Sequence, residues 1–236
     1  MSLPNTLDDA IAQAREATTA AIADGYPRLQ VELVFPELKM MPVAEKFLPV
    51  FEELGDRLRV FFPDAGAAAL ARRNWGEKPY AIRGINDMKA AIQPEEQVIL
   101  FVEPSSVEVS DVERLCQVAT DRTVVLLNPR MEDIATIGIG YAGRQLRERF
   151  LNTFESCYYI RPMDGAALLR AYPSPWQVWL ETDGSYNLIA EEPRKPVGDV
   201  LDRILTQASG GASETSQPQR KGLLTSIQQF LRALSQ

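Results

Sequence analysis

A chain of 236 residues with 45% apolar and 24% charged residues has the composition of an ordinary globular protein, which excludes an intrinsically disordered chain. Its net charge of −7 separates into −9 over residues 1–208 and +2 over the remainder. An acidic body argues against a nucleic-acid-binding surface, because such a surface needs clustered Lys and Arg.

The predicted elements begin with a helix over residues 7–24, which Asn5 or Thr6 caps and Gly25 ends. The residues before it include no basic region followed by an apolar run, so no signal peptide is expected. No later stretch approaches the ~20 apolar residues needed to span a bilayer, so no membrane span is expected either.

Strands and helices then alternate along the chain. Apolar runs bounded by turn residues predict strands over 29–35, 58–62, 98–102 and 123–127, and helix-period segments between them cover 43–54, 65–74 and 109–120. This alternation is typical of a mostly parallel sheet with right-handed crossovers. The fold class is therefore α/β, with a three-layer, Rossmann-like, doubly wound core.

The pattern changes after a helix over 144–154 and a strand over 156–160. The segments 168–171, 177–180 and 186–190 are β-rich, and Thr182-Asp183-Gly184-Ser185 predicts a hairpin turn because Asp-Gly readily takes positive φ. We therefore expect an antiparallel hairpin at the C-terminal edge of the sheet, followed by a helix over 197–207.

The last residues predict an appendage to a domain that covers residues 1–208. Residues 209–219 are rich in Ser and Gly and predict a flexible linker, and residues 220–236 predict an amphipathic helix. Its apolar stripe consists of Leu223, Leu224, Ile227, Phe230, Leu231 and Leu234. The stripe needs a surface to cover it, and the sequence leaves open whether that surface is its own domain, a partner helix or a membrane.

Several common chemistries are absent from the composition. The chain has no histidine, which excludes Ser-His and Cys-His catalytic arrangements and the commonest metal ligand. Cys116 and Cys157 are far apart in apolar segments, so no CxxC motif or Cys zinc site exists, and we interpret both as buried thiols in a reducing compartment. No metal or cofactor is expected.

Polar residues follow three of the predicted strands. In doubly wound folds ligands bind beyond the carboxyl ends of the strands, so we expect a polar crevice there. Its candidate lining residues are Asp64, Glu103, Ser105, Asn128 and Arg130, joined by Arg144 and Arg147 from an arginine-rich region suited to carboxylate or phosphate. The alternatives are that the loop residues only make turns and caps and that the arginines only pair with surface carboxylates. No residue is assigned as catalytic.

Two further motifs carry alternative interpretations. Residues 138–143 match GxGxxG, with Asp164 about twenty residues on, but residues 133–137 make a poor buried strand, so we interpret the glycines as a loop. Nucleotide binding stays open as an alternative. Trp176, after Pro173-Ser174-Pro175, fits either an interface anchor or a core residue.

One stretch resembles a known family. The residues that carry the resemblance are Arg149-Phe150-Leu151-Asn152-Thr153-Phe154-Glu155, Tyr158-Tyr159, Gly165-Ala166-Ala167-Leu168-Leu169-Arg170 and Pro173-Ser174-Pro175-Trp176-Gln177-Val178. They are similar to a domain-of-unknown-function family of cyanobacteria and plastids, which includes the plastid low-photosystem-II-accumulation protein and a domain fused to a plastid adenylate kinase. The resemblance extends over most of residues 5–208 and supplies no established catalytic residues.

The resemblance implies a cytoplasmic protein, peripheral at most to the thylakoid membrane. It also implies that at least one relative assists photosystem II assembly. Our first hypothesis is therefore a non-catalytic protein that assists assembly or maintenance of photosystem II through protein-protein contacts of the tail and Trp176. Partners would be photosystem subunits or assembly factors, and not nucleic acid. The alternative is a nucleotide- or anion-binding α/β domain, with or without an enzymatic reaction.

Overall fold

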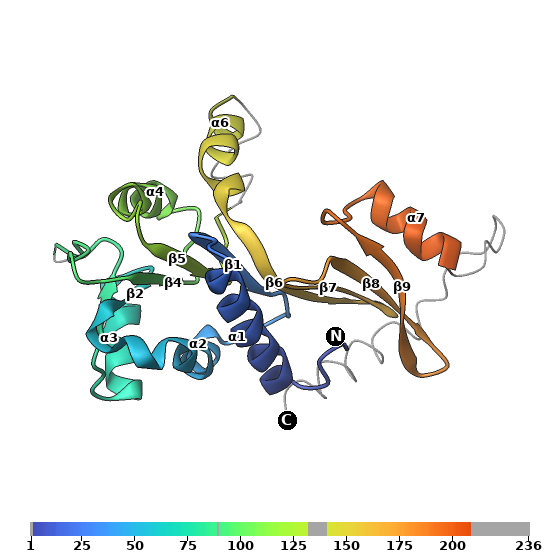
Figure 1. The fold of residues 1–236 in the computed structure, drawn as a ribbon, viewed down its shortest axis with the longest axis horizontal. Coiled ribbons are helices and arrows are strands. Elements are labelled where there is room, and N and C mark those ends of the chain that lie inside the picture. Colours follow the sequence, from blue (N-terminus) through green and yellow to red (C-terminus); the bar gives the residue numbers. More distant parts are fainter. Residues whose placement is uncertain (1, 89, 132–140, 209–236) are drawn as a thin grey trace.

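Over residues 2–88, 90–131 and 141–208, the part of the chain that the computed structural model describes, nine strands form a single sheet. The strands are β1 (Arg28–Leu33), β2 (Leu58–Phe62), β3 (Ala81–Gly84), β4 (Val98–Val102), β5 (Thr123–Leu127), β6 (Glu155–Met163), β7 (Ala166–Ala171), β8 (Trp176–Thr182) and β9 (Ser185–Glu192). Their order across the sheet is β3-β2-β4-β5-β1-β6-β7-β8-β9 (Figure 1). The predicted α/β fold is confirmed.

The six strands β1 to β6 run parallel, as the alternation of strands and helices predicts. β2 and β4 are buried along their whole length, which explains why β4 is wholly apolar. β2 is apolar except for Arg59, whose buried guanidinium group pairs with Glu96 at 2.6 Å. The chain leaves β2 toward the edge strand β3, whereas it leaves β4 in the opposite direction toward β5. Such a reversal is where open α/β sheets form a crevice at their carboxyl ends.

The strands β6 to β9 form an antiparallel meander that continues the same sheet. The predicted hairpin turn joins β8 to β9, with φ of 53° at Asp183 and 75° at Gly184. Two consecutive positive φ values are what a type I′ turn requires, and they match the twist of the flanking strands. The antiparallel C-terminal edge is therefore confirmed.

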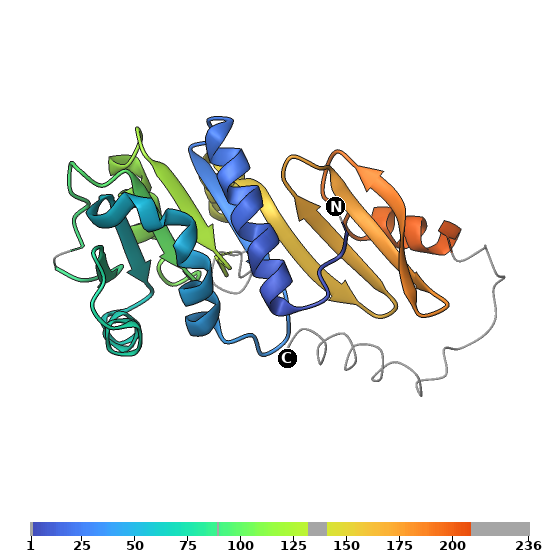
Figure 2. The same ribbon diagram turned by 60° about the horizontal axis from the view of Figure 1, so that its bottom comes forward.

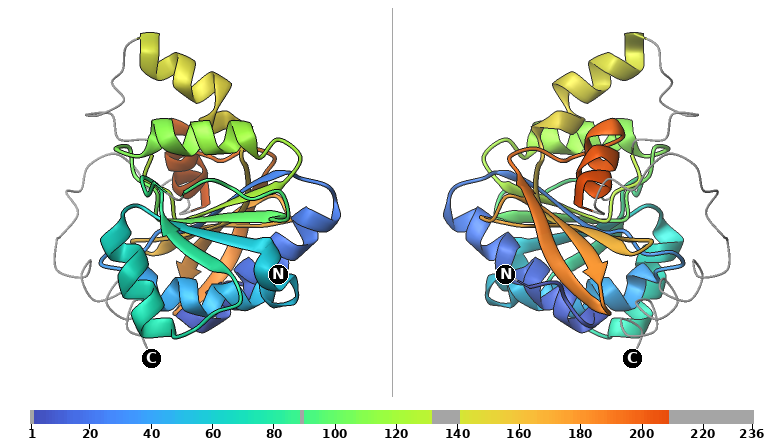
Figure 3. Two further views of the ribbon diagram at one scale, coloured as in Figure 1. Left: turned by 90° about the vertical axis from the view of Figure 1, so that its left-hand side faces the viewer. Right: turned by 90° about the vertical axis from the view of Figure 1, so that its right-hand side faces the viewer.

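Helices cover both faces of the sheet. One face carries α1 (Leu7–Ala23), α2 (Met40–Phe47), the 3₁₀ helix η1 (Leu48–Arg57) and α3 (Ala65–Trp75), with α1 and α2 side by side (Figure 2). The other face carries α4 (Val109–Val118), α6 (Tyr141–Arg149) and α7 (Asp199–Ala208), and η2 (Leu151–Thr153) connects α6 to β6 (Figure 3). None of the described helices combines the length and the apolar character needed to cross a bilayer.

The hydrophobic core is divided by the sheet. The larger cluster lies under α1, α2 and α3, and a second cluster lies under α4 and α6. A third, small cluster lies under α7 on the meander and consists of Tyr159, Leu168, Trp176, Val178 and Leu201. The α4 side of the sheet therefore has two separate apolar patches, one beneath α4 and α6 and one beneath α7.

Three local features differ from the prediction. β3 was not predicted, because this four-residue edge strand is too short to give a period. The helix predicted over 43–54 is divided into α2 and η1, and the latter contains Gly55 at φ 56°. α6 begins at Tyr141 and ends at Arg149, short of the predicted 154. The linker and tail (209–236), and residues 138–140 of the glycine motif, lie outside the described residues.

Candidate functional site

The loops after β4 and β5 bring together four of the predicted site residues. The Nη2 atom of Arg130 lies 2.8 Å from Oε1 of Glu103. The amide of Arg130 donates to the carbonyl of Pro104, and Ser105 pairs with Arg130 as an isolated parallel bridge. Glu103 and Asn128 both have positive φ, at 51° and 52°, so both strands end in a sharp left-handed turn.

The side chains of the other two residues, Asn128 and Ser105, also have partners within the fold. The Oδ1 atom of Asn128 accepts the amide hydrogen of Leu33 at 2.9 Å, which fastens the loop after β5 to β1. The hydroxyl of Ser105 donates to the carboxylate of Glu108 at 2.6 Å, just before α4 begins. Both contacts are of the kind made by residues in turns and helix caps, which is the alternative interpretation of these loop residues.

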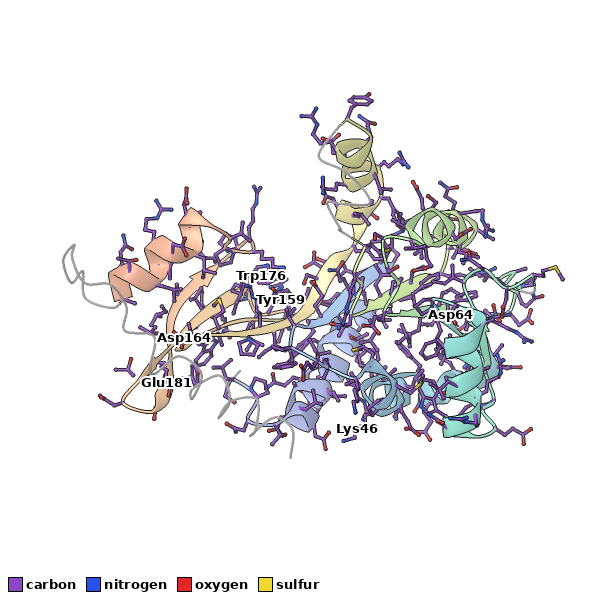
Figure 4. The ribbon with its side chains drawn as sticks, turned by 180° about the vertical axis from the view of Figure 1, so that it is seen from behind. Lys46, Asp64, Tyr159, Asp164, Trp176 and Glu181 are labelled. Carbon is purple, nitrogen blue, oxygen red and sulfur yellow. The ribbon has the colours of Figure 1, made fainter. Side chains whose placement is uncertain are left out.

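Asp64 lies at the end of β2 and caps α3. Its Oδ1 atom accepts the amide hydrogen of Ala67 at 2.8 Å. Figure 4 shows Asp64 beside α3, far from the labelled Tyr159 and Trp176. Since Asp64 caps a helix and Glu103 pairs with Arg130, these two carboxylates make separate contacts.

Arg144 and Arg147 lie on α6, which packs on the second core cluster through Leu146. Arg144 is exposed and Arg147 is half-buried. The neighbouring Arg149 forms a two-pronged pair with Glu113 of α4, at 2.7 and 2.9 Å. Hydrogen bonding from Arg149 lowers the pKa of the Glu113 carboxyl, so this arginine serves to hold α6 against α4.

A pocket of about 450 Å³ opens beside the loop after β5. We call it the β1 pocket, and it is lined by Gln30, Glu32, Pro129, Arg130, Met131, Leu151 and Lys195. Its residues come from β1, from the loop after β5, from η2 and from the segment before α7. Of the predicted site residues that the structure describes, only Arg130 lines it.

The floor of the β1 pocket is polar. Gln30 pairs in register with Ser156, and Glu32 pairs with Tyr159, so each pair projects to the same face of the sheet. The hydroxyl oxygen of Ser156 is buried and has no hydrogen-bond partner among the described residues. Polar side chains thus line two adjacent central strands of the parallel sheet.

Aromatic rings stand beside this floor. The Nζ atom of Lys195 lies 3.8 Å from the ring centroid of Tyr159 and 5.4 Å from that of Trp176. The centroids of the two rings are 5.2 Å apart. Figure 4 labels both residues on the same part of the sheet. Trp176 is only 7% exposed, so in the described chain it packs in the small core beneath α7.

The environment of Tyr159 keeps its hydroxyl protonated. Burial raises the pKa of Tyr159, and the carboxylate of Glu32 raises this pKa further. The positive charge of Arg161 and a hydrogen bond with it act in the opposite direction. The net shift is upward, so the hydroxyl remains a neutral polar group at physiological pH.

Sequence reasoning missed Gln30, Glu32, Tyr159 and Lys195. The available signal was Gln30 and Glu32 themselves, since a central parallel strand is normally apolar on both faces. In β1, only the alternate residues Leu29, Val31 and Leu33 are buried in the larger core, and Gln30 and Glu32 project to the other face. Lys195 gave no signal, because only the fold brings the segment before α7 to β1.

The arrangement can hold a polar molecule but shows no built metal centre. Arg130 and Lys195 supply positive charge, Glu32 accepts hydrogen bonds, and Gln30 both donates and accepts. Among the described residues, no three His, Cys, Asp or Glu side chains cluster as metal ligands would.

This doubly wound sheet, with its antiparallel meander and a polar pocket beside its central strand, defines a Rossmann-like α/β domain. A family model of a domain of unknown function, DUF1995, matches residues 4–203. The chain belongs to this family. The match covers every described strand and ends within α7, so the family domain and the folded α/β unit coincide.

Proposed function

We propose that the protein binds a small molecule carrying a phosphate or carboxylate group in the β1 pocket. The observation that carries this proposal is the convergence of Arg130 and Lys195, from distant segments, on one pocket with a polar floor. Two cations and one carboxylate, Glu32, line the pocket, and this excess of positive charge in an otherwise acidic chain favours an anionic ligand.

The pocket suits a ligand of metabolite size. Its volume of about 450 Å³ falls within the usual range for small-molecule sites. Arg130 is paired through Nη2 with Glu103, and its guanidinium group has further N–H donors for an anion. Glu32 and Gln30 would accept hydrogen bonds from hydroxyl or amino groups on the rest of the ligand, which favours a phosphorylated or carboxylated polar molecule.

Binding without turnover is the simpler role for this site. Of the carboxylates predicted to line the crevice, Asp64 caps a helix and Glu103 pairs with an arginine. General acid-base catalysis needs groups within hydrogen-bond reach of one substrate. We therefore infer a binding protein.

The test is a thermal-shift titration with inorganic phosphate, ribose 5-phosphate and AMP as probes. At least one probe should raise the melting temperature, and Arg130→Gln and Lys195→Gln should each weaken its binding about tenfold, as expected for a lost charged hydrogen bond. Arg73→Gln, an exposed arginine on α3, is the control and should bind normally. Equal binding by all three variants, or no shift with any probe, would contradict the proposal.

We propose as a second function that the protein assists assembly or maintenance of photosystem II, as a cytoplasmic protein with peripheral contact at the thylakoid. The support is the similarity of residues 149–178 to the family that includes the low-photosystem-II-accumulation protein. The apolar stripe predicted for residues 220–236 offers a means of contact with a partner.

Affinity capture from a cyanobacterial host tests this role. The intact chain should recover photosystem subunits or assembly factors, and a chain carrying Ile227→Asp and Phe230→Asp should recover fewer. Recovery of no such protein by the intact chain would count against the assembly role and leave the ligand-binding proposal untouched.

A further inference from the structure

A large groove lies on the α1 face of the sheet, away from the β1 pocket. It has a volume of about 940 Å³, runs between α1 and η1, and reaches the start of β4 at Val98. The α1 wall includes three alanines, Ala12, Ala20 and Ala23, whose small side chains leave room for a third element. We call this feature the α1–η1 groove.

The groove has an apolar interior and an acidic rim. Ile22 and Leu54 are half-buried within it and so retain surface that another apolar side chain can cover. Three acidic residues are exposed around the groove, Glu16, Glu52 and Glu53, and they outnumber its single basic lining residue, Arg15. A cationic amphipathic segment would match both properties of this surface.

The chain contains such a segment in residues 220–236. Its six-residue stripe of Leu, Ile and Phe is accompanied by Arg220, Lys221 and Arg232, and it carries no acidic residue. A helix of this length extends for about 25 Å, comparable to α1. Alone in water such a short helix is marginally stable, so it requires a surface on which to fold.

The linker is long enough to deliver this segment to the groove. Residues 209–219 can extend over about 36 Å. α1 packs on β6, which lies three strand spacings from β9, or roughly 14 Å, and the path from α7 around the β9 edge to the α1 face adds roughly 20 Å. The total of roughly 34 Å is just within the extended reach of the linker. A tethered segment also has an effective concentration near the millimolar range, so even a modest intrinsic affinity favours docking within the same molecule.

We propose that residues 220–236 dock as an amphipathic helix in the α1–η1 groove of the same chain. The apolar stripe covers Ile22 and Leu54, and the basic residues face Glu52 and Glu53. A membrane surface is a poorer occupant of the α1–η1 groove, because the acidic rim of the groove repels anionic lipid. The stripe is then withheld from other partners until a competing surface displaces it.

Crosslinking in the intact chain tests this placement. Ala20→Cys combined with Ile227→Cys should give an intramolecular crosslink with a short bismaleimide, at a yield independent of protein concentration. Two matched controls should react much less: Ala20→Cys with Gln229→Cys, which lies on the opposite side of the predicted helix, and Leu188→Cys with Ile227→Cys. Leu188 is 43% exposed on β9, so it offers an apolar surface outside the groove.

The crosslinking outcomes discriminate between the occupants. A preferred link to Leu188→Cys would place the segment on the meander, and crosslinks between two chains only would assign the groove to a second copy. Either result overturns the proposal, as does equal reaction of all pairs. Glu52→Lys with Glu53→Lys should reduce the intramolecular yield about threefold at low salt, in line with weak surface ion pairs.

Hydrogen exchange supplies a measurement that needs no cysteine. Ile227→Asp with Phe230→Asp in the intact chain should speed exchange of amides in residues 12–23 and 49–54. Exchange in residues 109–118, helix α4 on the opposite face of the sheet, should not change. Unchanged exchange over 12–23 and 49–54 would show that the segment does not cover the groove.

Discussion

Asn128 is the residue on which the geometry of the strand-end loops depends. Its side chain accepts the Leu33 amide, its own amide donates to Val31, and its φ of 52° lies in the left-handed region. Asparagine suits this position because it tolerates left-handed backbone and supplies an acceptor.

Asn128→Ala should therefore destabilise the protein by about 2–4 kcal/mol, since the Leu33 amide loses its partner and alanine is strained at positive φ. Asn128→Gly removes only the acceptor and should cost less, while Asn128→Asp should come closest to the parent. Urea denaturation measures the series. A glycine variant as unstable as the alanine variant would show that backbone strain makes no contribution here.

The two cysteines are predicted to be unreactive in the folded chain. Burial raises the pKa of the Cys116 thiol to about 12 and that of Cys157 to about 11, against about 8.5 for a free thiol. Both thiols thus stay protonated when folded, and their contribution to stability is intact below about pH 8.5 and declines as the pH rises toward these folded-state values.

An aromatic disulfide reagent, which releases a coloured thiolate when it reacts with a thiol, should label neither cysteine in the native protein at pH 8. It should label both in concentrated guanidinium chloride. The sequence-based interpretation of both residues as buried thiols agrees with their burial in the structure. Labelling of the native chain at the rate of a free thiol would show that the core around α4 or α1 opens readily.

At the scale of elements, the hydrophobic pattern predicted the strands whose own sequence determines them. It missed the features that depend on contacts between segments distant in the sequence. The buried strands β2, β4 and β5 are predominantly apolar, and the bounds of all three match the prediction. β3 is held by β2 and α3, not by its own propensity, so no pattern over Ala81–Gly84 marks it. Lys195 meets Tyr159 only through the folding of the meander, which is why the β1 pocket could not be derived from spacing.

The close approach of β3 to α3 makes Gly84 necessary. A Cβ atom at this position would lie 2.6 Å from the backbone nitrogen of Ala65 and 2.7 Å from the carbonyl carbon of Asp64. Neither backbone atom can move without shifting the start of α3. Only glycine allows the edge strand and the capped helix to meet at this distance.

Gly84→Ala should destabilise the protein by about 1–3 kcal/mol, as overpacking does, and should selectively speed amide exchange in residues 65–85. Ala81→Ser, at the other end of the same strand where the side chain is half-buried, is the control and should have a smaller effect. If exchange over 65–85 is unchanged in Gly84→Ala, the contact with α3 is looser than the described distance.

At the scale of the whole molecule, one continuous sheet joins two parts with very different cores. The parallel half is covered by helices on both faces and contains the two larger clusters. The meander depends on the small cluster beneath α7, in which Leu201 is the buried residue contributed by that helix. Local opening follows such differences in buried apolar contact.

Leu201→Ala should therefore cost about 2–5 kcal/mol locally and release α7 before the parallel sheet unfolds. Amide exchange should rise over residues 176–208 while residues 98–127 keep their protection, and Val197→Ala, at a side chain 61% exposed, should change neither region. Because Lys195 lies between β9 and α7, release of α7 should also free this lysine from the Tyr159 ring and weaken phosphate-probe binding at the β1 pocket. Simultaneous loss of protection in both regions would mean that the nine strands unfold as one cooperative unit. Lys195 could then leave the β1 pocket only when the whole fold is lost.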